Sequence, residues 1–341
     1  MSTDTIPRRR VVITGLGAIT PVGNTAHATW AALTAGRSGI GRITRFDPTG
    51  CPAEIGGEVK GFEPAAPLRV PLHPRGPDGE PVIWAVAPKE VKKLGRFTHL
   101  GLAAVVDAYT DSGLDAHRLA IAPERIGVNL GVGMGGLPEI IAMHDVLLAG
   151  GYRKISAFLI LQISANILAG QAGILLNCRG SNMSVASACA TSGHALGESF
   201  RAIQRGEADI MVAGGSEAVM TPLAVGAFAQ MRALSTRNDA PEKASRPYDR
   251  DRDGFVMGEG AGIVVLEDLA HAKKRGATIY AEVIGYGLSG DAYHITAPTP
   301  DGDGAYRSME AALKRAKISP SEIDYINAHG TSTPLGDEIE L

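Results

Sequence analysis

The stretch NMSVASACATSGHALG, residues 182–197, decides how the rest of the sequence is interpreted. A strand-like run passes through small residues around Cys189 and leads into an apparent helix. Small neighbours suit a sharp strand-to-helix turn whose side chain projects into a pocket. The helix N-terminus beyond the turn favours the thiolate and can hold a developing oxyanion. Cys189 is therefore a candidate nucleophile, and the alternative is a small buried apolar residue.

The other cysteines lack this setting. Cys178 lies in an ordinary turn and Cys51 in a surface-like run, so both are expected to be structural or incidental. Three widely spaced cysteines provide neither a disulfide framework nor a C-x-x-C pair for a metal. The cysteine usage fits a reducing cytoplasm, and we expect no bound metal.

A second candidate lies in DYINAHGTSTPLGD, residues 324–337. A short strand is expected at Tyr325 and Ile326, which would place His329 at a strand end, facing a cleft. His329 could act as a general acid or donate a hydrogen bond to an oxyanion, and the alternative is a structural histidine. Thr331 and Thr333 would point the same way in an extended chain and could grip a polar chain. A cysteine with a distant histidine does not by itself identify the reaction.

Two glycine-rich segments follow predicted strands, at residues 11–20 (VVITGLGAIT) and 126–136 (IGVNLGVGMGG). Both partly match dinucleotide-binding loops, but a lone G-x-G-x-x-G pattern is weak evidence. Neither has the helix start or the distant acidic residue that such a loop requires. We interpret Gly15, Gly17 and the glycines of the second segment as tight turns at strand ends.

Apolar runs alternate with helical patterns along the chain. Strands are predicted at residues 11–14, 125–130, 182–186, 209–214, 262–266 and 279–287. Helices are predicted at residues 26–34, 98–112, 192–205, with Gly206 as a C-cap, and 304–316. This alternation indicates βαβ units, an α/β fold and a largely parallel sheet.

Composition excludes several classes of protein. Of the 341 residues, 33 are Lys or Arg and 36 are Asp or Glu, so the net charge of −3 argues against nucleic-acid and basic membrane-surface binding. No signal peptide is recognisable and no apolar run reaches the ~18 residues of a membrane span, so a soluble protein is expected. The Pro-rich residues 64–88 are predicted to be an exposed excursion. The charge-rich residues 237–253 are predicted to be a solvated loop.

Taken together, the motifs resemble the β-ketoacyl-acyl carrier protein synthases, most closely the synthase II type of bacterial fatty-acid synthesis. The resemblance rests on VVITGLGAITPVGNT (11–25), SVASACATSGHALG (184–197), RALSTRND (232–239), RPYDRDRDGFVMGEGAG (246–262), DAYHITAP (291–298) and NAHGTSTPLGD (327–337). It covers the chain from its first strand to its last residues, apart from the Pro-rich residues 64–88. The segment SAFLILQISANILAG, residues 156–170, resembles the family segment that lines the acyl tunnel and the dimer interface, with core packing as the alternative.

The resemblance implies a thiolase-like α/β fold of two duplicated βαβ-rich halves in α/β/α/β/α layers. The halves would be residues 1–257 and an incomplete second half, 258–341. It implies a cytoplasmic homodimer whose partner is acyl carrier protein carrying acyl and malonyl groups. The only prosthetic group would be the phosphopantetheine arm of that carrier. The charged loop at 237–253 would then pack near the active site.

The resemblance also implies a decarboxylating Claisen condensation that yields 3-oxoacyl-acyl carrier protein. Cys189 would hold the acyl chain as a thioester, and its backbone N–H would form part of the oxyanion hole. His329 would support decarboxylation of the malonyl group and stabilise the enolate oxygen. Thr331 and Thr333 would bind the phosphopantetheine arm.

The sequence departs from the family at its C-terminal end. The family carries a K-S-x-x-G-H motif, with a second histidine and a lysine, and later a G-F-G-G loop. Neither is present in this sequence, which ends at Leu341. The 341 residues are either a fragment of a longer enzyme or a truncated product. If they are the whole protein, we expect acylation of Cys189 but negligible condensation. Two alternatives remain: a polyketide-type ketosynthase, and a non-catalytic partner of the chain-length-factor kind, against which Cys189 argues. A coenzyme A thiolase lacks support, since the 291–298 and 327–337 motifs match the synthases.

Overall fold

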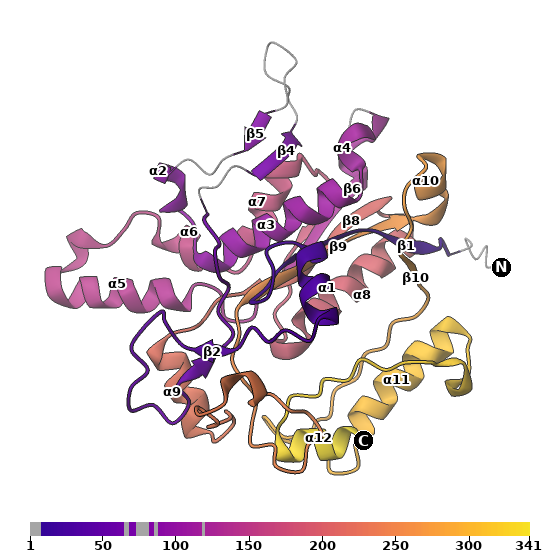
Figure 1. The fold of residues 1–341 in the computed structure, drawn as a ribbon. Helices are drawn as coiled ribbons and strands as arrows, with labels where there is room; N and C mark the ends of the chain where they lie inside the picture. The colour runs from indigo at the N-terminus through magenta and orange to yellow at the C-terminus, as the bar shows by residue number, and fades with distance from the viewer. Residues whose placement is uncertain (1–7, 65–67, 73–81, 85–87, 118–119) are drawn as a thin grey trace. The chain divides into compact units, whose positions relative to one another are not determined.

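A computed structural model of the chain describes residues 8–64, 68–72, 82–84, 88–117 and 120–341 (Figure 1). The chain forms two compact units. Unit 1 comprises residues 1–37, 59–219 and 259–283, and unit 2 comprises residues 38–58, 220–258 and 284–341. The predicted division into 1–257 and 258–341 refers to sequence halves rather than compact units, and it stays a prediction.

A six-stranded sheet forms the centre of unit 1 (Figure 1). Its strand order is β10-β1-β9-β8-β6-β7. The strands are β1 (Val11–Ile19), β6 (Ile126–Gly131), β7 (Asn182–Met183), β8 (Ile210–Glu217), β9 (Gly260–Asp268) and β10 (Ala281–Val283). Each of the predicted strands overlaps one of these, although β7 and β10 are shorter than predicted.

The prediction of a largely parallel sheet is wrong, because the sheet is mixed. Strand β6 pairs in parallel with β7 and β8, whereas β1 pairs antiparallel with β9 and β10, and β8 pairs antiparallel with β9. A helix that crosses over between two strands of one sheet favours the parallel direction, as α8 does between β7 and β8, which lie on either side of β6. Between β8 and β9 the chain instead passes through residues 220–258 of unit 2 and returns in the opposite direction.

Helices cover both faces of this sheet. Two consecutive residues of β8 point to opposite faces and contact different helices. The Ser216 hydroxyl donates to the Phe97 carbonyl of α3 at 2.7 Å, whereas Gly215 faces Ser192 of α8. The helices of unit 1 are α1 (Ala26–Thr34), α2 (Pro88–Val91), α3 (Arg96–Asp111), α4 (Leu114–His117), α5 (Leu137–Gly150), α6 (Leu159–Ile163), α7 (Ile167–Leu176), α8 (Thr191–Gln204) and α10 (Leu269–Lys274). The predicted helices at 26–34, 98–112 and 192–205 are confirmed, and Gly206 follows α8 with φ +76°.

Helix α3 lies so close to β1 that only glycine fits between them. Gly15 and Gly17 occupy the interior of β1, so their assignment to a turn is wrong. A Cβ at Gly17 would lie 2.0 Å from the Ala104 carbonyl oxygen, and one at Gly15 would lie 2.2 Å from that of Ala108. Helix α3 can therefore bury nearly its whole length, including Phe97, Leu100 and Tyr109, which stabilises unit 1 through removal of apolar surface from water.

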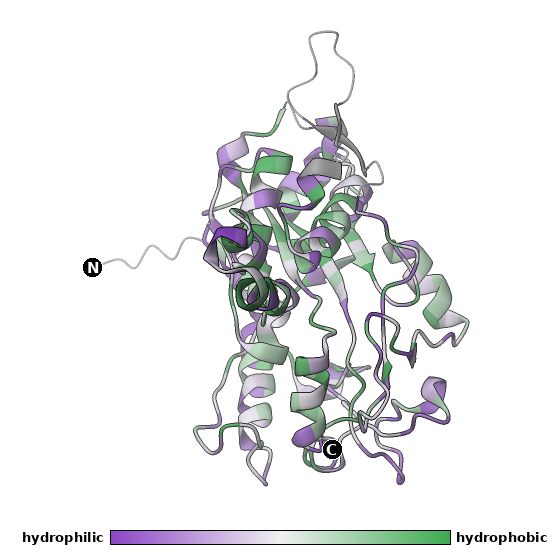
Figure 2. Cartoon of the chain, turned by 90° about the vertical axis from the view of Figure 1, so that its left-hand side faces the viewer, coloured by the Kyte–Doolittle hydropathy of each residue, from purple (hydrophilic) through white to green (hydrophobic). Residues whose placement is uncertain are grey.

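Other helices of unit 1 are amphipathic. Helix α8 buries Ala195, Phe200 and Ile203 and presents polar residues elsewhere on its surface. In Figure 2, green hydrophobic and purple hydrophilic residues alternate along the helices, as one buried face requires. The second part of the predicted tunnel segment contributes Leu168 and Ala169 of α7 to the core.

The Pro-rich residues 64–88, which were predicted to be exposed, lie largely outside the described residues. The described part contains strands β4 (Leu68–Leu72) and β5 (Val82–Trp84), which pair antiparallel. A separate sheet element therefore interrupts the segment that had been predicted as a loop.

Unit 2 holds fewer regular elements. Its strands and helices are β2 (Gly41–Arg42), β3 (Ile55–Gly56), α9 (Pro222–Gln230), α11 (Asp303–Ala316) and α12 (Pro334–Glu340). The predicted helix at 304–316 is confirmed as α11, and β2 pairs antiparallel with β3. The predicted strand at Tyr325 and Ile326 is wrong, because no strand is assigned at either residue and both side chains are exposed.

A buried carboxylate ties α10 to the sheet. Glu267 of β9 accepts hydrogen bonds from Arg275 through both oxygens, at 2.8 and 2.7 Å, and from the Thr14 hydroxyl at 2.8 Å. Its other close neighbour is His271 Nδ1, 2.5 Å away. Burial opposes ionisation of Glu267, but the bonds from Arg275 and His271 outweigh it and hold the pKa at about 2.

We predict that Glu267→Gln lowers the free energy of unfolding by about 3 kcal/mol at pH 7, because it leaves Arg275 without its buried partner. The depressed pKa of Glu267 means that its contribution is present above the unfolded value near 4.5 and is lost as the pH falls toward about 2. Urea unfolding followed by circular dichroism at pH 7 and pH 3 measures both effects. Glu282→Gln, at the exposed pair with Arg10, is the control and should cost less than about 1 kcal/mol. Equal losses in the two variants would contradict the assignment.

Candidate active site

Cys189 lies in a short 3-10 turn, η4 (Ala188–Ala190), directly before α8. The predicted strand-to-helix turn is confirmed, since β7 leads through the irregular residues 184–187 into this turn. The alternative of a buried apolar cysteine is excluded, because Cys189 is exposed. A thiol in this position is accessible to a substrate and lies at the positive end of a long helix. We use "the Cys189 turn" for residues 187–190.

The first turn of α8, which follows the Cys189 turn, rests directly on two neighbouring parallel strands. A Cβ at Gly131, the last residue of β6, would lie 2.2 Å from Thr191 Cγ2. A Cβ at Gly215 in β8 would lie 2.4 Å from Ser192 Oγ. The first turn of α8 can therefore approach β6 and β8 only because both positions are glycine.

The second glycine-rich segment is held by a carboxylate. Glu217, at the end of β8, accepts hydrogen bonds from the backbone N–H groups of Met134 (2.7 Å) and Gly135 (3.1 Å). Burial raises the pKa of Glu217, although these bonds act in the opposite direction. The tight turn predicted after β6 is present, and Glu217 occupies the N–H groups that would face a phosphate in a dinucleotide-binding loop.

His329 lies in unit 2, on an exposed, irregular segment that precedes α12. The Glu340 carboxylate accepts the backbone N–H groups of both His329 and Gly330. Burial opposes ionisation of Glu340, but these two N–H groups and the Tyr248 hydroxyl lower its pKa. The segment turns at Gly330, whose φ is +48°. Glu340 therefore fixes the backbone of His329, although no strand supports it.

The Thr331 and Thr333 hydroxyls lie on the same side, but not because the chain is extended as predicted, since Ser332 between them has φ +69°. Their hydroxyl oxygens lie 3.0 Å apart. A Cβ at Gly336 would lie 2.5 Å from Thr333 Oγ1, so this glycine leaves room for the hydroxyl. The pair presents two neighbouring donor and acceptor groups to one side of the segment.

A buried aspartate organises this segment. Asp337 is 1% exposed and accepts the backbone N–H groups of Tyr248 at 2.8 Å and Ser332 at 3.0 Å. Arg252 lies 3.4 Å from Asp337 and also donates to the carbonyl oxygens of Thr333 and Pro334. Asp337 thus joins α12 to the charge-rich loop at 237–253.

The prediction that residues 237–253 form a solvated loop is wrong for two of its arginines. The side chains of Arg246 and Arg252 are 16% and 17% exposed, whereas that of Arg250 is 92% exposed. Arg246 pairs with Asp253 at 3.1 Å, and its backbone N–H donates to the Ser332 hydroxyl. Charge composition could not separate arginines that bind the chain from those that face water.

Of the predicted site residues, the structure brings Thr331 and Thr333 together on the segment that carries His329. Cys189 belongs to unit 1, whereas His329, Thr331 and Thr333 belong to unit 2. Sequence reasoning missed Asp337, Glu340, Ser187 and His194 as supports of these residues. All but Glu340 occur in the quoted motifs, but their partners are distant in sequence or depend on the turn geometry.

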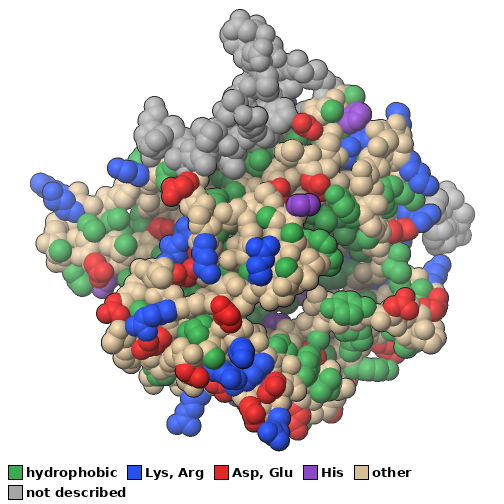
Figure 3. All heavy atoms as spheres, viewed as in Figure 1, with side chains coloured by type: hydrophobic (Ala, Val, Ile, Leu, Met, Phe, Trp, Pro, Cys, Tyr) green, Lys and Arg blue, Asp and Glu red, His purple; other side chains and the backbone are tan. Residues whose placement is uncertain are grey.

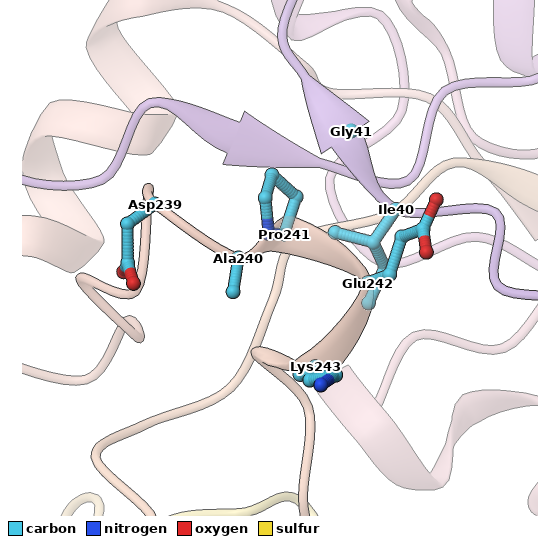
Figure 4. A pocket seen from close by; sticks show the side chains of 7 residues that line it. All are labelled: Ile40, Gly41, Asp239, Ala240, Pro241, Glu242 and Lys243. Atoms are coloured by element: carbon cyan, nitrogen blue, oxygen red, sulfur yellow. The ribbon is translucent and has the colours of Figure 1, made fainter.

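The described residues contain no group of three or more His, Cys, Asp or Glu side chains that could hold a metal ion. None of their helices has the length and apolarity that crossing a bilayer requires. A cavity of about 340 Å³ in unit 2 is lined by Ile40, Gly41 and residues 239–243, and none of the predicted site residues lines it (Figure 4).

Comparison with known proteins places the chain. The model of the beta-ketoacyl synthase N-terminal domain matches residues 8–272, and that of the C-terminal domain matches residues 280–341. The chain belongs to the beta-ketoacyl synthase family.

Individual relatives sharpen this placement. The chain is 47% identical over 333 residues to 3-oxoacyl-[acyl-carrier-protein] synthase 2 of Coxiella burnetii, and 48% identical over 340 residues to the protein of that name from Rhizobium meliloti. In both cases 98% of this chain matches 76% of the relative.

Solved structures agree on the fold. The ishigamide ketosynthase/chain length factor matches with a TM-score of 0.84 at 36% identity, covering 98% of this chain and 76% of that one. A beta-ketoacyl synthase from Burkholderia phymatum matches with a TM-score of 0.82 at 33% identity, covering 97% and 76%. The predicted thiolase-like α/β fold is confirmed at this level.

We predict that Gly131→Ala lowers the free energy of unfolding by about 1–3 kcal/mol and slows alkylation of Cys189 by iodoacetamide, because the new methyl group displaces Thr191. Thermal unfolding and intact mass spectrometry measure the two effects. Gly262→Ala in β9 is the matched control, since a Cβ there meets nothing within 4 Å. Unchanged stability and alkylation in Gly131→Ala would show that the close approach of α8 is not required.

Proposed function

We propose that the chain catalyses the decarboxylating Claisen condensation of an acyl-enzyme thioester with malonyl-acyl carrier protein, giving 3-oxoacyl-acyl carrier protein in fatty-acid elongation. The observation that carries the proposal is the exposed thiol of Cys189 in a turn before a long helix. Curated relatives at 43–48% identity bear the name 3-oxoacyl-[acyl-carrier-protein] synthase 2, which supports the same reaction.

In the first step the Cys189 thiolate attacks the thioester carbonyl of the acyl carrier. The C–S bond to the carrier breaks and the carrier leaves as its thiolate, which takes up the proton that Cys189 released on ionising; the acyl chain stays on Cys189 as a new thioester. The backbone N–H of Cys189 contributes to stabilising the oxyanion of the tetrahedral intermediate. Covalent capture divides a reaction of two large substrates into two simpler steps.

In the second step the malonyl group loses CO₂, and the electron pair of the broken C–C bond forms an enolate. The enolate carbon attacks the thioester on Cys189 and expels the thiolate. His329 supports this step by hydrogen bonding to the developing enolate oxygen, and Glu340 holds the backbone of His329 for that purpose.

The substrate carrier is acyl carrier protein, and its phosphopantetheine arm binds at Thr331 and Thr333. The neighbouring hydroxyls provide two polar contacts for an amide-containing arm. A solved structure with 31% identity is described as a type II polyketide acyl-carrier protein in complex with its ketosynthase, which supports this class of partner. The chemistry of both steps needs no resident metal or cofactor, because the thiolate and the thioester supply the reactive groups.

Two alternatives are not favoured. A polyketide ketosynthase would use the same residues, and one similar solved structure is of a type II PKS, but the curated relatives bear the name 3-oxoacyl-[acyl-carrier-protein] synthase 2. A non-catalytic subunit would lack the nucleophile, whereas Cys189 is present and exposed.

The protein is a homodimer in the cytoplasm under this proposal. Apolar side chains are exposed over α5 and α6 of unit 1, and Figure 3 shows green side chains on the surface over α5. They are Ile140, Val146, Leu147, Leu148, Ile160 and Leu161. So many exposed apolar residues on adjacent elements are typical of a protein interface.

We predict that Cys189→Ala abolishes acyl transfer from hexanoyl-acyl carrier protein, because Cys51 and Cys178 are less exposed and neither lies in a turn before a long helix. Intact mass spectrometry with peptide mapping detects the acyl adduct. Cys178→Ala is the matched control and should be acylated at the rate of the unaltered chain. Acylation of Cys189→Ala, or acylation of the unaltered chain at another residue, would contradict the proposal.

We predict that the double substitution Thr331→Val and Thr333→Val raises KM for acyl transfer about tenfold with little change in kcat, because two hydroxyl hydrogen bonds to the arm are lost. Valine keeps the shape of threonine, and Thr34→Val on exposed α1 is the control. Hexanoyl-pantetheine, which lacks the carrier protein, should show the same increase in KM. An increase confined to the carrier-bound substrate would exclude contact with the arm.

A further inference from the structure

Ser187, two residues before Cys189, is held by three hydrogen bonds. Its hydroxyl lies 2.6 Å from Nδ1 of His194, its backbone N–H donates to the Thr191 hydroxyl at 2.8 Å, and its carbonyl accepts the Ala190 N–H at 3.1 Å. Thr191 and His194 both belong to the first turn of α8. Ser187 is therefore attached to the helix on the other side of Cys189.

The residue between Ser187 and Cys189 has an unfavourable backbone conformation. Ala188 has φ +49°, in the left-handed region that residues with a Cβ rarely adopt. Ser187 has φ −148° and ψ 45°, outside the regions of regular structure. The backbone angles of these two residues set the direction in which the Cys189 side chain leaves the chain. A strained conformation persists only where surrounding contacts impose it.

The packing on the strands does not impose this conformation by itself. Glycine at 131 and 215 fixes the positions of Thr191 and Ser192, which follow Cys189. Before Cys189, Ser184 donates to the Leu130 carbonyl at 2.8 Å and Val185 accepts from the Val132 N–H at 3.3 Å. Ser187 is attached instead to α8, through its N–H to Thr191 and its hydroxyl to His194, and these bonds join the two sides of the Cys189 turn. The His194 side chain is half-buried. We assign it a role because it provides this attachment for the Cys189 turn.

We propose that His194 and Ser187 are positioning residues: their hydrogen bond holds Ala188 in its left-handed conformation and thereby directs the Cys189 thiol toward the acyl donor. This inference rests on the proposed function of Cys189 as acyl acceptor. His194 acts through Ser187 and touches neither the substrate nor the thiol in this assignment. The polar group at the position of Nδ1 is the part of the imidazole that matters.

The test compares variants that differ in this one polar group. Ser187→Ala and His194→Leu remove the hydrogen bond, whereas His194→Asn keeps a polar atom near the position of Nδ1. Ser199→Ala is the control, because it removes a buried hydroxyl of the same helix that has no hydrogen-bond partner among the described residues. For each variant, the rate of acyl transfer from hexanoyl-acyl carrier protein to Cys189 is measured by mass spectrometry, beside the thermal unfolding midpoint.

We expect Ser187→Ala and His194→Leu to slow acyl transfer about tenfold, and His194→Asn to restore the rate to within about threefold of the unaltered chain. Ser199→Ala should leave the rate unchanged. The proposal is overturned if His194→Asn is as slow as His194→Leu, or if Ser187→Ala is as fast as the unaltered chain. Should His194→Leu fail to fold, the Ser187→Ala and His194→Asn results still decide between these outcomes.

A second readout separates this inference from the proposed function. Iodoacetamide alkylation of Cys189 requires no carrier protein, and the variants should follow the same order of rates. If the unaltered chain is not acylated at all, the proposed function fails. If it is acylated and the variants show no order in either assay, only the positioning role fails.

Discussion

The close approach of the first turn of α8 to strands β6 and β8 is the constraint on which the candidate active site depends. It is possible only because Gly131 and Gly215 carry no side chain where Thr191 and Ser192 lie. The approach places the helix N-terminus over the ends of two parallel strands, where ligands of α/β proteins commonly bind. The exposed thiol of Cys189 directly precedes this helix start in the chain.

In unit 2, the segment that carries His329 is held in place by charged groups rather than by strands. The His329 segment has no strand to support it, and charged groups fix it instead. Buried Asp337 joins α12 to Tyr248 and Arg252 of the charge-rich loop, while Glu340 binds the backbone of His329. Unpaired backbone N–H groups are costly when they are removed from water, so two carboxylates that accept four such groups supply much of the order of this segment.

Local pattern predicted the parts of the structure that depend on local spacing. Helix α1 has the bounds that the sequence predicted, because helical periodicity is a property of neighbouring residues. Thr331 and Thr333 were predicted to share a side on the assumption of an extended chain; their hydroxyls are neighbours, but through a left-handed Ser332 with φ +69°. Strand direction, the strand expected at Tyr325 and the placement of Gly15 depend on distant partners, so they were predicted wrongly. The bonds of Asp337 and Glu340 also join residues far apart in sequence, and the motif resemblance alone indicated that this region matters.

The glycine-rich loop after β6 has a consequence for how this protein responds to its surroundings. In nucleotide-binding proteins a phosphate of the ligand satisfies such a loop, so the loop depends on the concentration of that ligand. Here the side chain of Glu217 supplies the anion from within the chain. The glycine-rich loop after β6 therefore needs no bound phosphate to satisfy these N–H groups. Its conformation is set by the amino-acid sequence and not by the concentration of a ligand in the cell.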